Sequence, residues 1–108
     1  MKTLNYNHKP KEIRNAKDLI RFVRGIPAKF WCVDARDNGK GQHCVLGHLD
    51  NAYGSASGHT DGFSDNELAI ANNGVIGPYS FSERNVGAQL DGRSIKNRVL
   101  KLLRSKAK

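Results

Sequence analysis

Apolar residues recur at intervals of three and four in three segments of the chain, and this spacing constrains the fold more than any other feature. Such spacing places side chains on one face of a helix. The segments span residues 11–24, residues 44–53 and the residues from about Ser94 onward. We therefore predict three helices with one apolar face each. Their apolar positions are Ile13, Ala16, Leu19, Ile20 and Val23; Cys44, Val45, Leu46, Leu49, Ala52 and Tyr53; and Ile95, Val99, Leu102 and Leu103.

Residues that begin and end helices frame these segments and predict a fourth helix. Pro10 suits the first turn of the first helix, and Gly25 suits its end. Ser64 and Glu67 have the spacing of a capping box, in which each side chain accepts from the backbone N–H of the other residue. We expect a short helix from this box to about Asn73.

The segment that links the first two helices has a different pattern. Residues 30–33 form a short apolar run, and residues 37–41 supply turn residues that can adopt positive φ. This pattern predicts a short β-hairpin or an extended pair. Tyr79 and Phe81 alternate around Ser80, which favours either a strand or an anchored loop. The predicted fold is mainly α, with α+β as the alternative, and has about four helices.

The length of 108 residues fits one compact domain. We assign residues 1–108 to it, with residues 1–10 as a flexible tail and residues 105–108 as a frayed basic tail. No stretch approaches the roughly 20 apolar residues of a membrane helix, and the first residues lack an apolar secretion segment. We expect a cytoplasmic protein with no membrane partner. Cys32 and Cys44 are too few for a disulfide scaffold, so we expect thiols.

Positive charge is concentrated at the two ends of the chain. Residues 1–24 carry seven Lys and Arg against two acids, residues 25–92 carry four against eight, and residues 93–108 carry seven with no acid. Basic ends attract nucleic acid or an acidic protein surface, or else only keep a small domain soluble. We expect the last helix to bury its apolar residues and turn its cations to water. The cations that we assign to partner binding are Arg14, Lys17, Arg21, Arg98, Lys101, Arg104 and Lys108.

Histidine and cysteine side chains offer two further chemistries. His43, Cys44 and His48 are close in sequence, and Cys32 or His59 would complete four metal ligands. The paired spacings of structural zinc sites are absent, so we assign no metal and no cofactor. Cys44 with His48 or His59 is the alternative catalytic set, in which a histidine would activate the thiol. No local signature joins these residues, and we assign no catalytic residue.

Several short motifs resemble, in their order, a family of short uncharacterised bacterial and phage proteins. That family has a Trp-Cys segment, a Cys-x-Leu-Gly-x-Leu helix, and an Asn-Asp dipeptide before its last helix. Here His48 replaces a small residue, and Asn85 precedes Val86 instead of Asp. The resemblance implies a compact, mostly helical domain often carried by mobile elements, without an established activity. The matching motifs are residues 16–20 (AKDLI), 30–32 (FWC), 35–37 (ARD) with Gly39, and 44–49 (CVLGHL).

We rank first a small basic, non-enzymatic binding protein of phage or mobile-element type. It would act on nucleic acid or on a host complex that handles nucleic acid, as an inhibitor in one version, and in the host cytoplasm if phage-encoded. The alternatives are a small Cys/His-dependent hydrolase or transferase and a structural or assembly module. A continuous basic stripe shared by the first and last helices favours binding, whereas a cleft where a thiol meets a histidine favours catalysis. The oligomeric state is left open.

Overall fold

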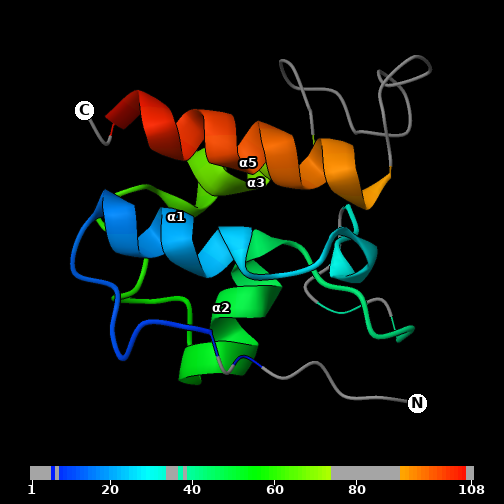
Figure 1. Ribbon diagram of the computed structural model, residues 1–108, viewed down its shortest axis with the longest axis horizontal. Coiled ribbons are helices and arrows are strands. Elements are labelled where there is room, and N and C mark those ends of the chain that lie inside the picture. The colour runs from blue at the N-terminus through cyan, green and yellow to red at the C-terminus, as the bar shows by residue number, and fades with distance from the viewer. Residues whose placement is uncertain (1–5, 7, 34–36, 38, 74–90, 107–108) are drawn as a thin grey trace.

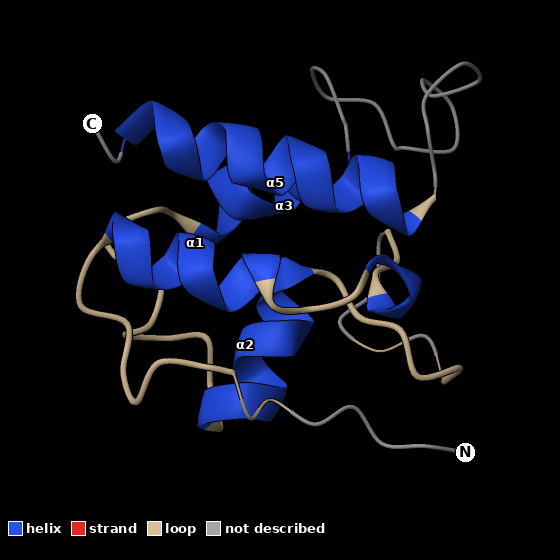
Figure 2. Ribbon diagram, viewed as in Figure 1, coloured by secondary structure: helices blue, strands red, loops and turns tan. Residues whose placement is uncertain are grey.

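Four α-helices build the part of the chain that the structure describes, which comprises residues 6, 8–33, 37, 39–73 and 91–106 of a computed structural model. The helices are α1 (Ala16–Arg24), α2 (Val45–Tyr53), α3 (Asp65–Asn73) and α5 (Gly92–Lys106), and a 3-10 turn, η1, covers Ala28–Phe30. Figure 2 shows that helices and loops account for these residues. The mainly α prediction is confirmed. The expected features at residues 74–90 lie outside the described residues.

Helix α1 begins five residues later than predicted, because asparagine and not proline caps it. The Asn15 side chain accepts from the backbone N–H of Asp18, and the Asp18 carboxylate accepts from the backbone N–H of Arg14 at 2.9 Å. The bond to Asn15 satisfies an N–H group that the helix start leaves without a partner. The bond to Asp18 holds the residue that precedes the cap. Pro10 is buried before the helix, and its carbonyl accepts from the Tyr53 hydroxyl at 2.6 Å. The end of α1 at Gly25 is as predicted.

Helices α1 and α5 run antiparallel and side by side, with α3 packed against α5 and α2 against α3 (Figure 1). The predicted apolar face of α5 is confirmed at Ile95, Val99 and Leu103, which have no exposed surface. Each fully buried side chain of this kind contributes about 1.5–3 kcal/mol. The other apolar side chains that are fully or almost fully buried include Leu19, Phe22, Val23, Ile26, Trp31, Val45, Leu49 and Leu68.

The extended pair predicted after α1 is a single parallel bridge between Trp31 and His43. The backbone N–H of Cys32 donates to the carbonyl of His43, and the N–H of His43 donates to the carbonyl of Phe30, both at 3.0 Å. Because the pairing is parallel, it does not form the hairpin that we also considered. The bridge aligns the chain that enters α2 with the segment that carries Trp31.

Part of the segment that we expected to be a flexible tail packs against the domain. The ring of Tyr6 stacks on Phe22 with centroids 5.8 Å apart. His8 donates from Nε2 to the carbonyl of Phe22 at 3.1 Å and lies where a side chain at Gly25 would be. Residues 105 and 106, expected to fray, continue α5. Residues 1–5, 7, 107 and 108 lie outside the described part. No described helix has the length and apolar character that crossing a membrane requires.

The capping box predicted at the start of α3 is confirmed. The Ser64 hydroxyl accepts from the N–H of Glu67, and the Glu67 carboxylate accepts from the N–H of Ser64, both at 3.0 Å. We expect Ser64→Ala to lower the free energy of unfolding by about 1 kcal/mol, measured by urea denaturation. Glu67→Gln is the matched control, because its amide oxygen can still accept, and it should be nearly neutral. Equal stability of Ser64→Ala and the parent protein would contradict the capping role.

Candidate functional site

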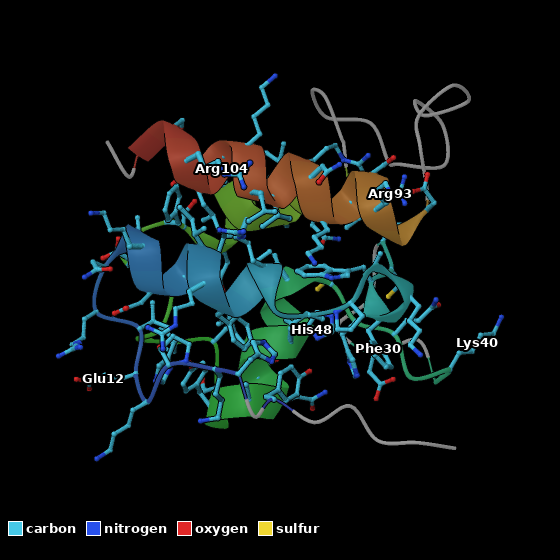
Figure 3. The ribbon with its side chains drawn as sticks, viewed as in Figure 1. Glu12, Phe30, Lys40, His48, Arg93 and Arg104 are labelled. Atoms are coloured by element: carbon cyan, nitrogen blue, oxygen red, sulfur yellow. The ribbon has the colours of Figure 1, made fainter. Side chains whose placement is uncertain are left out.

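His48 of α2 lies in the middle of the domain with no exposed surface, beside Phe30 in Figure 3. Its Nε2 is 2.9 Å from the carbonyl oxygen of Phe30, and its Nδ1 is 2.8 Å from the hydroxyl of Tyr6. Because a carbonyl only accepts, Nε2 carries the hydrogen and Nδ1 accepts from the hydroxyl. Burial, and next the His43 imidazole, lowers the pKa of His48 from 6.5 to about 3, although the Phe30 carbonyl opposes this shift. His48 is therefore neutral in the folded protein.

Polar and aromatic side chains surround His48. The rings of Trp31 and His43 meet the imidazole edge-on, with centroids 4.6 and 5.1 Å away. The Asn51 amide donates to Nε2 of His43 at 3.0 Å. Burial raises the pKa of Tyr6, although a hydrogen bond from Asn51 opposes it. These groups hydrogen-bond from the buried imidazoles out to half-buried Tyr6 and exposed Asn51, so the cluster holds α2 against the N-terminal segment and the Trp31 bridge.

The alternative catalytic set is not assembled as a thiol activated by a histidine. Both ring nitrogens of His48 already face oxygen partners, so neither is available to Cys44. His59 stacks on the ring of Tyr53 at 4.6 Å and donates from Nδ1 to the carbonyl of Ser55 at 3.0 Å. Its ring therefore stands in the loop after α2, in contacts of its own.

The two cysteines are buried thiols. Burial, followed by the charges of Cys44 and Asp37, raises the pKa of Cys32 to about 11. The thiolate is the nucleophilic and metal-binding form of cysteine, so the environment of Cys32 disfavours both chemistries at that residue at neutral pH. Within the described ranges, no three His, Cys, Asp or Glu side chains lie together as a metal site would require. The set considered from the sequence, His43, Cys44 and His48 with Cys32 or His59, therefore does not converge.

Asn72 is a fully buried polar residue that joins three parts of the fold. Its Oδ1 accepts from the N–H of Val45 at 2.9 Å, at the start of α2. Its Nδ2 donates to the carbonyl of Cys32 at 3.0 Å. One amide side chain thus connects the end of α3, the start of α2 and the bridge segment. The sequence gives no signal for this role, because asparagine near a helix end usually indicates only a cap or a turn.

Arg98, which we expected to face water, is half-buried against the end of α3. Its Nε donates to the carbonyl of Ala71 at 3.1 Å, and its Nη2 donates to the carbonyl of Asn72 at 2.9 Å. The last carbonyls of a helix lack partners within that helix, and a cation placed there also interacts favourably with the negative end of the helix dipole. Arg98 therefore holds α5 against α3. The prediction that its side chain faces water is wrong.

We expect Arg98→Ala to destabilise the domain by about 2 kcal/mol, because it removes charged hydrogen bonds to two carbonyls. Lys101→Ala is the matched control, since Lys101 is exposed on the same helix and should change stability by less than about 0.5 kcal/mol. Chemical denaturation of both variants measures the difference. Equal stabilities would contradict the fastening role of Arg98.

The neighbouring helices α1 and α5 both carry cations at their surface, and we call this set of cations the basic face. On α1 it comprises Lys17, Arg21 and Arg24, which are exposed and spaced i, i+4 and i+7 along one side of the helix. On α5 it comprises exposed Arg93 and Arg104, eleven residues apart and thus nearly aligned, together with half-buried Lys96. Figure 3 labels Arg93 and Arg104 toward opposite ends of α5.

Lys96 ties the two helices of the basic face together. Its Nζ donates to the carbonyl of Arg24 at 2.9 Å, which places the two cationic residues side by side. Burial, and next the positive charge of Arg24, lowers the pKa of Lys96. No acidic residue occurs between residues 92 and 108 to offset this charge. Helix α5 therefore adds cations and no acidic residue to the basic face.

The other cations assigned from the sequence differ in their surroundings. Arg14 lies 3.8 Å from the carboxylates of both Glu12 and Asp18, so its charge is partly balanced. Lys101 is exposed on the outer side of α5. Lys108 lies outside the described residues. Our sequence reasoning missed Arg24, which continues the spacing of Lys17 and Arg21 in register, and it missed Arg93 and Lys96 on the last helix.

Comparisons with protein-family models, curated proteins and solved structures give no match to this chain. The family resemblance of its short motifs therefore stays an expectation.

Proposed function

We propose that this protein is a non-enzymatic nucleic-acid-binding protein that acts through the basic face of α1 and α5. The observation that carries the proposal is the antiparallel pairing of these helices, which brings together cations about 70 residues apart in sequence. The spacing of Lys17, Arg21 and Arg24 keeps three cations on one side of α1. Phosphate groups are the ligands that such surfaces attract most strongly.

The electrostatics of the basic face support a polyanionic ligand. Like charges held close together repel each other, so an anion bound beside Lys96 and Arg24 would relieve the repulsion between their charges. A nucleic acid would supply a row of negative charges along both helices. The surroundings of His48 support a non-enzymatic role, because both of its ring nitrogens are hydrogen-bonded within the protein and neither is placed to activate a thiol.

The double variant Arg21→Glu/Arg104→Glu tests the proposal. Both residues are exposed, so the variant should fold, and we expect its affinity for a labelled nucleic acid at about 0.1 M salt to fall by at least about tenfold. Fluorescence anisotropy measures the affinity, and thermal melting confirms folding.

The control variant is Lys11→Glu/Lys40→Glu, which changes the net charge by the same amount at exposed positions outside α1 and α5. Figure 3 shows Lys40 at the edge of the molecule, away from Arg104. We expect this variant to lose less than about threefold in affinity, since only the general field changes. Equal losses in the two variants would refute a localised site. Binding of an acidic protein instead, with no affinity for any nucleic acid, would overturn the proposal.

A further inference from the structure

We infer that the ligand of the basic face is double-helical DNA, contacted through its phosphates without reading of the bases. This inference rests on the proposed function and adds the class of nucleic acid and the mode of contact. Three observations on the described residues carry it: the absence of an accessible aromatic ring on α1 and α5, the two-row arrangement of the cations, and the scarcity of uncharged polar groups between them.

Proteins that bind single strands usually stack bases on aromatic side chains. The only aromatic residue of α1 and α5 is Phe22, which is fully buried. Among the described residues elsewhere, half-exposed rings already have neighbours on them. The ring of Tyr53 is stacked against His59, and the Lys9 ammonium lies 4.6 Å from the centroid of the Tyr53 ring. The Lys29 ammonium lies 5.2 Å from the centroid of the Phe30 ring. The basic face therefore offers cations but no platform for an unpaired base.

The cations form two rows, one on each helix. Packed helices lie about 8–10 Å apart, and the eleven residues from Arg93 to Arg104 span about 16 Å at 1.5 Å per residue. Two phosphate strands that border a groove of B-DNA present charges on a similar scale, because the major groove is about 12 Å wide and the minor groove about 6 Å. A duplex thus presents two fixed rows of phosphates to two fixed rows of cations, which a flexible single strand does not.

Few groups on the basic face are suited to recognising RNA. Double-stranded RNA is bound largely by its shape and through its phosphates and 2′-hydroxyls, and a hydroxyl both donates and accepts, whereas Lys and Arg side chains only donate. The exposed residues of α1 on this side are all cations. On α5, Asn97 is exposed, but the Ser105 hydroxyl donates to the carbonyl of Leu102 in its own helix. This composition favours DNA as the duplex.

The test compares four labelled probes of about 20 nucleotides or base pairs with the full-length protein. They are a DNA duplex of arbitrary sequence, a shuffled DNA duplex, one of the DNA strands alone, and the RNA duplex of the first sequence. We expect the two DNA duplexes to bind within about twofold of each other and the single strand about fivefold more weakly. The RNA duplex should also bind more weakly than DNA. If all six cations contact phosphates, the slope of log affinity against log salt should be about −5 for duplex DNA.

A second variant separates phosphate contact from base reading. Arg21→Lys/Arg104→Lys keeps both charges but loses the bidentate fork with which arginine recognises guanine, so we expect the two DNA duplexes to lose affinity by the same factor, within about twofold. A preference of about tenfold for one DNA sequence would overturn phosphate-only contact. Tighter binding of the single strand or of RNA would overturn the assignment to duplex DNA while leaving nucleic-acid binding intact. Absence of binding to every probe at low salt would overturn both.

Discussion

Asn72→Ala should unfold this domain more readily than any other single truncation of a polar side chain, with a loss of about 3 kcal/mol in the free energy of unfolding. The substitution removes the acceptor of the Val45 N–H and a donor to the carbonyl of Cys32, both deep in the structure. Each buried polar group that loses its partner costs about 1–3 kcal/mol. For a domain of this size the melting temperature should fall by more than about 10 °C, measured by circular dichroism.

Two comparisons isolate the cause of this loss. Asn66→Ala makes the same change at an exposed position of α3 and should shift stability by less than about 0.5 kcal/mol. Asn72→Asp keeps the acceptor for Val45 but loses the Nδ2 donor and introduces a carboxylate at a buried position, so it should also be destabilised. A stable Asn72→Ala protein with an unchanged melting temperature would show that the amide does not join the three segments.

Acidification should destabilise the folded protein through His48. In the unfolded chain this imidazole takes up a proton near pH 6.5, whereas in the fold its pKa is about 3. Between these values the unfolded state binds the extra proton, so stability is complete above about pH 6.5 and falls as the pH decreases. The slope is about 1.4 kcal/mol per pH unit, which gives a loss of about 2 kcal/mol between pH 7 and pH 5. Urea denaturation at a series of pH values measures it.

The variant His48→Gln distinguishes this titration from the general effect of acid. The glutamine side chain carries an amide donor and acceptor but no titratable group, so the variant should be less stable at pH 8 and lose less between pH 7 and pH 5. His59→Gln is the control, because His59 lies in the loop after α2, and it should keep the slope of the parent. If His48→Gln and the parent show the same slope, the imidazole of His48 does not cause the acid sensitivity.

Local sequence signals were sufficient to locate the helices, although not to fix every boundary. The apolar spacing of α5 and the pair Ser64 and Glu67 depend only on residues three or four apart, so the chain itself reports them. The predicted start of α1 was wrong because two residues that favour a helix start, Pro10 and Asn15, compete there. Asn15 determines the helix start, because its side chain accepts from the N–H of Asp18. The carbonyl of Pro10 instead accepts from the Tyr53 hydroxyl.

The candidate site was only partly predictable, because its key contacts join residues far apart in sequence. Periodicity places Arg98 on the outer face of α5, but it does not reveal that α3 ends against that face. For the same reason the sequence left His48 as a catalytic candidate, although its partners, Tyr6 and Phe30, lie 42 and 18 residues away. The exposure of Lys17 and Arg104 could be predicted from the sequence, because it follows from their position opposite the apolar faces.

The measurement that tests the central claim most directly is a map of the binding surface by nuclear magnetic resonance. A short DNA duplex is titrated into isotope-labelled protein, and backbone amide and arginine Nε shifts are followed. We predict the largest changes at the residues of the basic face, with Arg21, Arg24 and Arg104 foremost, and little change at His48 and Asn72. Changes that cluster around Cys44 and His59 while α1 and α5 stay unaffected would contradict the account.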